Sequence, residues 1–534
     1  MLIKTLQGLN VPDEKNIIFV SPQYSSWEQL LSKNELILQK RAELSVSRSE
    51  LLNIAKDYTR AMTPASGFEG IDENIIVTGH QAIWHHCGIL AKNSITSRFA
   101  ADVNGCPIHL VLDHDICDTA IVLPKKQADG DWCFERIEIE PVQNSIPLGF
   151  RPPPQKKIIQ ALSDAIGRIY GKQFCCMIWS QYLGLPSNCL PDFKNVADFI
   201  TCFQAMLNSA LGIKMLYLPV SLLSASSCFI DFAASVIINA SDFAHSYNKA
   251  VFDQMKYKNV NTSETIRPLM VDYSKGFIEL PFWLVSCQGR RTSLYVKLED
   301  NGGIKICTAA TDLGGLDSSE NGGKIEQIKN ILNQQKYRLW PKAVTLTLFV
   351  RLFLADWFVH GVGGALYENI TDKIIEDYYR IEKLRFAVAT ATVTLPLCDC
   401  ARTTGETSDE LKQRLRDFKY NPEKFIEDSL MQTEPVKSLL DEKKKLIETT
   451  RNRDLTIQEK KSAWQAISAV NKSLFQFTGN ALQNLNEKIK LLDSRCLAQQ
   501  VLNYRQYFFG LLPEEILRDM LQKKTIENNN SNEG

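Results

Sequence analysis

Histidine and aspartate side chains that could do chemistry gather in two short segments of this 534-residue chain. Five of its seven histidines lie between residues 80 and 114. One segment contains His80 with His85 and His86 behind it, and the other contains His109 and His114, the latter between two aspartates. Imidazole titrates near neutral pH, and carboxylates hold protons or Mg²⁺, so these residue types suit acid–base chemistry or metal binding.

The first segment, Thr78-Gly79-His80-Gln81, stands where a strand would turn into a helix. Backbone amides of such a turn can hold an anion, and His80 could donate to a phosphate or act as a general acid or base. The alternative is an ordinary turn whose histidine caps the helix. A single glycine is a weak phosphate signature, so the segment alone leaves both interpretations open.

The second segment is Asp113-His114-Asp115, with Asp118 just beyond. Three carboxylates and an imidazole could bind Mg²⁺ or Zn²⁺, or supply a general base oriented by a neighbouring acid. Aspartates that merely form a turn would give the same letters.

Both segments follow compact apolar runs, at residues 75–77 and 108–112, and residues 88–101 between them have a helical pattern. This order predicts a βαβ unit with parallel neighbouring strands. Both polar segments would then emerge at the carboxyl edge of one sheet, which is where open α/β sheets bind ligands.

Other candidate residues lie further along the chain. His360-Gly361-Val362-Gly363-Gly364, followed by Tyr367, would let a backbone approach a ligand closely, or would form a simple glycine hinge. Arg291, near an aromatic Pro-Phe-Trp segment, could clamp an anionic ligand or lie on an ordinary hairpin surface. Asn248 is expected on a helix.

Composition excludes some classes of partner. The chain has 61 Lys plus Arg and 61 Asp plus Glu, so its net charge offers no long-range attraction to nucleic acid or an anionic membrane. Its 14 cysteines are scattered, and its first residues lack the pattern of a signal peptide. We expect a cytoplasmic protein with a small-molecule substrate. The apolar stretches 215–240 and 343–359 contain proline or charged residues and are interpreted as core elements.

The patterns predict an α/β protein with a Rossmann-like parallel sheet core, inserted connecting segments and a C-terminal α-helical coiled-coil arm. The expected parts are an N-terminal helical segment (1–73, with helices over 27–63), the core (74–405), the arm (406–510), and a C-terminal return with a disordered tail (511–534). Inside the core we expect helices over 141–212, antiparallel strands over 276–308, one helix over 343–359, a helix capped by Thr371-Asp372, and a strand over 385–395.

The residues also resemble a known family. The turn at residues 77–81, Gly88, Lys92, Gly105 and the strand ending in Asp113-His114-Asp115 resemble the cysteine-adding enzymes of bacillithiol synthesis. Those enzymes have a Thr-Gly-Gln-Gln turn, Gly-Pro and Lys in the next helix, and a strand ending in Glu-Asp-His-Asp. This chain departs from them at His80, Ile89, Leu112 and after Gly364, and resembles more closely a sister group with a Gly-His-Gln turn and a Lys-Asn pair like Lys92-Asn93.

The resemblance implies a ligase that uses ATP, with Mg²⁺, to join the carboxyl group of cysteine to an amino-sugar malate conjugate, and a homodimer formed through the arm. His80 would stabilise phosphate charge, His114 would act as acid or base, and Asp113 and Asp115 would orient it or hold Mg²⁺. The expected ligand-binding residues are Thr78, Gly79, Gln81, His86, Lys92, Asn93, Asn248, Arg291, His360, Gly361, Gly363, Gly364 and Tyr367.

Two rival functions remain open. The first is a metal-dependent hydrolase that uses His80, His85 or His86 with the Asp113-His114-Asp115 segment. The second is a non-catalytic nucleotide-binding or scaffold protein whose coiled coil recruits partners, favoured by Leu112 in place of the family's glutamate.

Overall fold

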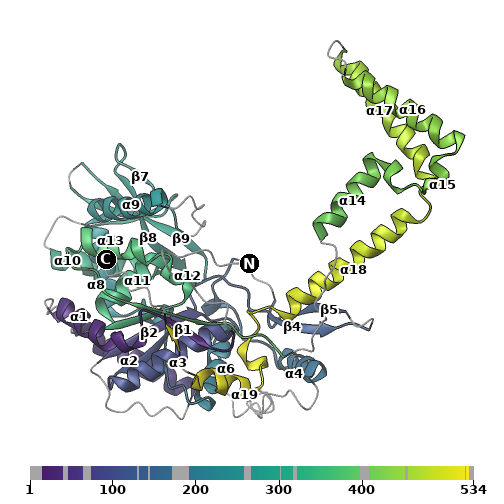
Figure 1. The fold of residues 1–534 in the computed structure, drawn as a ribbon. Helices are drawn as coiled ribbons and strands as arrows, with labels where there is room; N and C mark the ends of the chain where they lie inside the picture. The colour runs from purple at the N-terminus through teal and green to yellow at the C-terminus, as the bar shows by residue number, and fades with distance from the viewer. Residues whose placement is uncertain are drawn as a thin grey trace. The chain divides into compact units, whose positions relative to one another are not determined.

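The computed structural model describes residues 15–39, 46–63, 74–128, 131–141, 145–170, 192–257, 266–300, 302–316, 321–396, 408–451, 455–523 and 525–527. It is a mixed α/β protein with a mostly parallel six-strand sheet, antiparallel sheets and C-terminal helices (Figure 1). The chain forms two compact units. Unit 1 contains residues 1–123, 136–395 and 505–534, and unit 2 contains residues 124–135 and 396–504.

The main sheet of unit 1 brings together strands from both ends of the chain. Its order is β1 (Ile18–Ser21), β14 (Ala387–Ala391), β13 (Trp357–His360), β2 (Ile75–Gln81), β3 (Cys106–Leu112) and β6 (Leu216–Pro219). The five strands from β14 to β6 are parallel, whereas β1 is antiparallel to β14, and the short β15 (Ile526–Glu527) extends the sheet beside β1. The carboxyl ends of these five parallel strands, β14, β13, β2, β3 and β6, therefore lie at one edge.

The predicted βαβ unit is confirmed. Strands β2 and β3 are parallel neighbours joined through α3 (Cys87–Asp102), with His80 opposite Val111. Gly79 allows the strands to approach, because a Cβ atom there would lie only 2.8 Å from the Leu110 Cβ.

The two faces of this sheet differ in polarity because side chains alternate along each strand. Val77, Ile108 and Leu216 point into the large apolar core, which they share with α2 (Val46–Met62) and α8 (Ser227–Ile238). On the other face, His109 contacts Asn93 of α3, and Tyr217 contacts Asn208 of α6 (Val196–Ala210). The face beneath α3 and α6 thus carries the polar side chains.

A second sheet in unit 1 confirms the antiparallel strands expected over 276–308 and extends beyond them. Its order is β11 (Asp312–Leu316), β10 (Ile304–Cys307), β9 (Arg291–Leu298), β8 (Phe277–Ser286) and β12 (Tyr337–Pro341), with β7 (Val271–Asp272) pairing with β8. Each neighbouring pair is antiparallel. Strands β4 (Ile121–Lys126) and β5 (Trp132–Ile137) form a separate pair.

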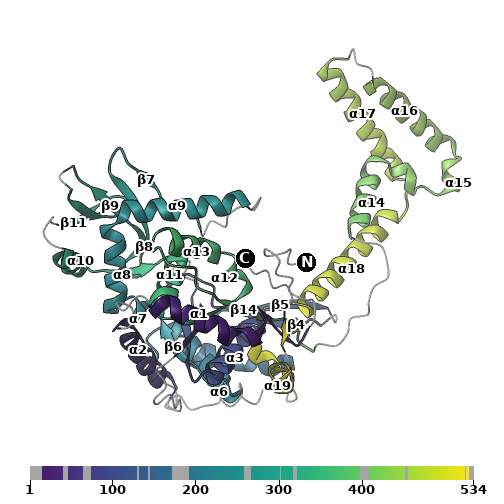
Figure 2. The same ribbon diagram turned by 60° about the vertical axis from the view of Figure 1, so that its left-hand side comes forward.

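Helices cover both sheets (Figure 2). The predicted helices over 27–63 are present. Of the helical range expected over 141–212, α4 (Lys156–Tyr170) and α6 are present, residues 145–155 hold only a short 3-10 helix (Leu148–Phe150), and residues 142–144 and 171–191 lie outside the described residues. The other helices of unit 1 are α1 (Trp27–Gln39), α7 (Val220–Leu223), α9 (Ala240–Tyr257), α10 (Asn321–Gln334), α11 (Ala343–Phe353), α12 (Val362–Ala365), α13 (Glu368–Asp377) and α19 (Glu514–Gln522).

Two predicted elements are wrong. The single helix expected over 343–359 is α11 followed by strand β13, because a short apolar run with aromatic and β-branched residues fits a buried strand as well as a helix. The cap expected at Thr371-Asp372 lies inside α13, which begins after Tyr367. In addition, β1 adds a strand to the N-terminal segment that was expected to be helical, and the strand expected over 385–395 is the shorter β14.

Unit 2 is built mainly from the predicted C-terminal helices. They are α14 (Ser408–Tyr420), α15 (Asp428–Met431), α16 (Glu434–Arg451), α17 (Ile457–Phe475) and α18 (Ala481–Leu502). Helices α16 and α17 pack side by side in both views (Figures 1 and 2), and Val436, Val470 and Leu474 form part of a small core. Residues 528–534 of the expected disordered tail lie outside the described residues.

Among the described helices, no single one is long and apolar enough to cross a membrane. Only Ser227–Ile238 and Ala240–Met255 together, bent by 91° at their break, pass a test of length and composition.

Candidate functional site

The carboxyl edge of the main sheet collects the sequence-predicted polar segments, as the parallel order of β13, β2 and β3 requires. His360 ends β13, His80 and Gln81 end β2, and Asp113 follows β3. The Gln81 side chain donates a hydrogen bond to Asp115 Oδ2 at 3.2 Å. This bond links the two segments that the sequence placed at one edge.

Lys92 of α3 lies beneath this edge with only 3% of its surface exposed. Its Nζ donates to the Gly79 carbonyl at 2.7 Å. A Cβ atom on Gly361 would lie 3.8 Å from the same Nζ, so the glycine turn after β13 passes close to the amine. Burial lowers the pKa of Lys92 to about 7. Within the described parts of the chain, no carboxylate forms an ion pair with Lys92.

Three imidazoles lie in a row beside Lys92. The ring centroids of His80 and His85 are 5.2 Å apart, and those of His85 and His109 are 5.3 Å apart. His109 Nδ1 lies 2.9 Å from Asn93 Oδ1, which places Asn93 under the sheet. Burial, reinforced by the neighbouring histidines, holds the pKa of each imidazole well below its usual range. The row is therefore uncharged at neutral pH, and the half-buried His80 is its outermost member.

The helix-capping role considered for His80 belongs to His86. The His86 Nδ1 accepts a hydrogen bond from the Gly88 backbone N–H at 3.0 Å and forms the N-cap of α3. Burial, followed by the charges of Arg505 and Lys92, lowers the pKa of His86 to about 4. A neutral imidazole nitrogen can accept this bond, so His86 has a structural reason to be present.

Asp113 and His114 are both buried, in contrast to Asp115. The Asp113 carboxylate accepts hydrogen bonds from the Ser221 backbone N–H at 2.9 Å and from the Ser221 hydroxyl. Burial raises the pKa of Asp113 to about 6 and lowers that of His114 to about 4. The His114 ring packs edge-on against Trp340, with centroids 6.2 Å apart. Both oxygens of Asp113 are thus engaged in holding the start of α7.

Asp115 is the accessible carboxylate of this segment, with 38% of its side chain exposed. Arg291 of the second sheet reaches it, because Nη1 lies 3.7 Å from Asp115 Oδ1 and donates to the His114 carbonyl at 3.0 Å. The Arg291 guanidinium also lies 5.0 Å from the Trp283 ring centroid. The structure therefore brings the predicted Arg291 to the same edge as Gln81 and Asp115.

Several predicted ligand residues have structural roles instead. Asn248 binds the Leu269 backbone through both its amide nitrogen and its oxygen, at 2.9 and 2.6 Å. Thr78 is buried and donates to the Val359 carbonyl at 2.8 Å. Tyr367 occupies the N-cap position of α13. Asn248 and Thr78 thus bind backbone groups of the fold, and the backbone of Tyr367 begins α13.

The sequence did not single out a buried charged cluster behind the glycine turn. Arg351 is 2% exposed and forms ion pairs with Glu368 Oε2 at 2.5 Å and Asp372 Oδ1 at 2.7 Å. The other Glu368 oxygen lies 3.2 Å from His360 Nε2. Burial raises the pKa of Glu368 to about 7, against the opposing effect of Arg351. The available signal was an arginine within the apolar stretch 343–359, because a buried arginine needs acidic partners.

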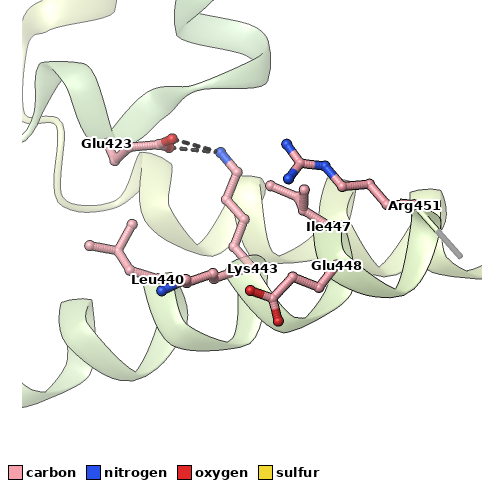
Figure 3. Close-up of a pocket in the computed structure, with 7 residues that line it drawn as sticks. Glu423, Leu440, Lys443, Ile447, Glu448 and Arg451 are labelled. Carbon is pink, nitrogen blue, oxygen red and sulfur yellow. Dashed lines mark hydrogen bonds and ion pairs between the residues drawn. The ribbon is translucent and has the colours of Figure 1, made fainter.

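Two further features bear on other ligands. In the described residues, no group of three or more His, Cys, Asp or Glu side chains is placed to hold a metal ion. A pocket of about 260 Å³ lies in unit 2 and is bordered by α16, where Lys443 pairs with Glu423 at 2.7 Å (Figure 3). Its lining residues are Glu423, Leu440, Lys443, Lys444, Ile447, Glu448 and Arg451. None of the predicted site residues lines it.

No protein-family model and no curated protein sequence matches this chain.

Proposed function

We propose that this chain is an ATP-dependent ligase, similar to the cysteine-adding enzymes of bacillithiol synthesis, that joins a carboxylate to an amine. In this proposal unit 1 is a Rossmann-like core with inserted segments, and the helices of unit 2 form a coiled-coil arm. The observation that carries the proposal is the buried Lys92 amine at the carboxyl edge of a parallel sheet.

Among the residues that the structure describes, the buried Lys92 amine has no carboxylate partner, and this favours an anionic ligand. Removing an ammonium group from water is costly, and an opposite charge nearby offsets that cost. Gly361 lies within van der Waals distance of the Lys92 side chain, so the backbone of this turn passes beside the amine, while Gly363 and Gly364 are exposed. A phosphate group at this turn would meet the Lys92 charge and the backbone amides that follow β13. The half-buried His80 would contact the same phosphate from β2.

The proposed reaction has two steps. A carboxylate oxygen of the first substrate attacks a phosphorus atom of ATP, and the amine of the second substrate then attacks the activated carbonyl carbon. Lys92 and His80 would stabilise the charge on the phosphate during the first step. Asp115, with Arg291 and Gln81 beside it, would position the amine or Mg²⁺. One accessible carboxylate suffices for Mg²⁺, which proteins bind largely through substrate phosphates and water.

Thermal stability in the presence of nucleotides tests this proposal. ATP with Mg²⁺ should raise the unfolding temperature of the full chain, since a ligand at a hundredfold excess over its dissociation constant stabilises by about 2.7 kcal/mol. His80→Ala and Asp115→Ala should each reduce the ATP-induced shift and leave the unliganded transition nearly unchanged. His245→Ala, which alters an exposed histidine of α9, is the matched control and should retain the full shift.

Two outcomes would reject the ligase. The first is a wild-type chain that shows no shift with ATP, ADP or AMP. The second is a chain that binds ATP but forms no amide when supplied with L-cysteine and the amino-sugar malate conjugate, which would favour the non-catalytic nucleotide-binding alternative.

We also propose a homodimer formed through the helices of unit 2. Trp464 and Ile457 of α17 are 59% and 89% exposed, which leaves apolar surface available on this helix pair. Replacing residues 434–475 with a short linker should convert the dimer into a monomer that keeps a folded unit 1. Light scattering measures the mass of both chains, and a full-length chain that is monomeric at micromolar concentration contradicts the dimer.

A further inference from the structure

His360 stands between a buried carboxylate and the glycine turn. Its ring is 5% exposed and stacks on Phe358, with centroids 4.1 Å apart. Nε2 lies 3.2 Å from Glu368 Oε1, whereas a Cβ atom on Gly364 would lie 3.1 Å from Nδ1. The two ring nitrogens therefore face different groups, with an acid on one side and an exposed glycine on the other.

The Glu368 carboxylate is held firmly in place. Its Oε2 is bound by Arg351, which in turn pairs with Asp372 and donates to the Leu384 carbonyl. Oε1 is left to face His360. His360 Nε2 has no hydrogen-bond partner among the described residues, and Glu368 is the group placed to accept a hydrogen bond from its N–H. The atoms are at ion-pair distance without ideal hydrogen-bond alignment, as is common for catalytic pairs before the substrate binds.

We infer that Glu368 is a positioning residue that orients His360, and that His360 Nδ1 accepts a proton from the amine substrate at the Gly361–Gly364 turn. The inference rests on the proposed ligase function and adds to it the identity of the base. A carboxylate at Nε2 fixes the proton on that nitrogen, so the lone pair of Nδ1 points toward the turn. Gly364 serves this arrangement because any larger residue would crowd Nδ1.

The proton transfer accompanies formation of the amide bond. The amine nitrogen forms a bond to the activated carbonyl carbon and gives one proton to His360 Nδ1. The electron pair of the broken C–O bond leaves with the phosphate group. The imidazolium that results lies beside Glu368, whose negative charge stabilises it.

The charged surroundings set the pH at which this pair works. Arg351 and Lys92 face His360, and together with burial, which is the larger cause, they hold its pKa well below the usual range. Arg351 and Asp372 face Glu368, whose pKa lies at about 7. The form with ionised Glu368 and neutral His360 therefore gains population as the pH rises above about 7.

The tautomer of His360 tests the inference without any ligand. In the full chain labelled with ¹⁵N-histidine, the imidazole nitrogen shifts at pH 8 should show His360 with a protonated Nε2 and a bare Nδ1. Glu368→Gln should change these shifts, while the His109 signals, fixed by Asn93, serve as the internal control. The inference is overturned if His360 is protonated on Nδ1, or if its nitrogen shifts are the same in Glu368→Gln as in the wild type.

A second variant, Glu368→Asp, tests the inference if Glu368→Gln does not fold. Glu368→Asp keeps the charge but withdraws the carboxylate from Nε2, and should change the His360 shifts in the same direction. In the ligase assay, Glu368→Gln should lower kcat by on the order of 100-fold with little change in the KM for ATP. Unchanged kcat overturns the role of the pair. Because the tautomer is read without nucleotide, a chain that fails to bind ATP disproves the ligase proposal and leaves the orientation of His360 by Glu368 separately tested.

Discussion

Lys92→Met should abolish the stabilisation of the protein by ATP and should make the unliganded protein more stable. The first effect follows because the buried amine is the group proposed to meet the phosphate charge. The second follows because methionine fills a similar volume without a charge that must be taken out of water. A substitution that raises stability while it removes binding is the pattern expected of a functional residue, and a purely structural lysine would show the opposite.

The pH dependence of stability should separate the two proteins. Lys92 has a pKa of about 7 in the folded chain, below its unfolded value of about 10.4. The unfolded chain therefore binds more protons between these values, so the stability of the wild type should rise with pH in this window relative to Lys92→Met. The unfolding free energy of the wild type should gain roughly 4 to 5 kcal/mol relative to that of Lys92→Met across this window, and most of the gain should be reached near pH 10. Unfolding midpoints measured for both proteins from pH 6 to pH 10 give this difference, and parallel curves would contradict it.

Nucleotide binding should take up a proton above pH 7. A phosphate beside Lys92 favours the ammonium form, so an amine that is neutral in the free protein becomes charged in the complex. Calorimetric titrations in buffers of different ionisation enthalpy measure this uptake, which should approach one proton per ATP near pH 8 and vanish in Lys92→Met. Lys443→Met is the control, since Lys443 is equally buried but lies in unit 2 and pairs with Glu423. Binding without proton uptake by the wild type would place the phosphate elsewhere.

The sequence predicted the βαβ unit well because its signals are local. The apolar runs at residues 75–77 and 108–112 each end in polar residues, and a helical pattern lies between them. Parallel pairing then follows from general rules of connection, and with it the placement of Gln81 and Asp115 at one edge. The helices of unit 2 were predictable for the same reason.

Strand β13 was missed because a contact far along the chain decides it. The apolar stretch 343–359 gives no periodicity that separates a helix from a helix followed by a strand. In the structure, the Asp356 carboxylate accepts a hydrogen bond from the Ile75 backbone N–H at 2.8 Å, at the point where the chain enters β13 beside β2. A bond between residues 281 positions apart leaves no local pattern.

The sequence predicted only part of the candidate site, because it shows residue types but not which side chains long-range packing will bury. Residue type pointed to His80, Asp115 and Arg291, which the fold brings to one edge or close to it. It did not reveal that Lys92 is buried, or that Asp113 is fully engaged by Ser221, since burial depends on the packing of α3 and α7. Glu368 was overlooked because a glutamate in the first turn of an amphipathic helix is common. The sequence does not show its ion pair with the buried Arg351, which explains why a carboxylate is buried there.

Arg351→Met should destabilise unit 1 by about 3 to 5 kcal/mol. Removing one partner of a buried ion pair leaves the other charge uncompensated, and Glu368 is only 2% exposed. The arginine also joins α11 to α13 and to the Leu384 carbonyl ahead of β14, so several elements lose a common contact. Arg136→Met is the control, because Arg136 is 45% exposed and its pairs with Asp118 and Glu138 are worth at most about 1 kcal/mol.

The pH dependence and a double variant identify the cause of this loss. Without Arg351, the folded-state pKa of Glu368 should rise above its wild-type value of about 7, so the stability deficit of the variant should grow as the pH increases above about 7 and should be smaller at pH 5, where Glu368 is protonated in both folded proteins. Adding Glu368→Gln should recover part of the stability at neutral pH, because no unpaired charge then remains beside His360. Chemical denaturation at pH 5 and pH 8 measures both effects. If the stability deficit is independent of pH and the double variant recovers no stability, the charge of Glu368 is not the cause of the loss. Arg351 would then stabilise unit 1 through its packing and its hydrogen bond to the Leu384 carbonyl.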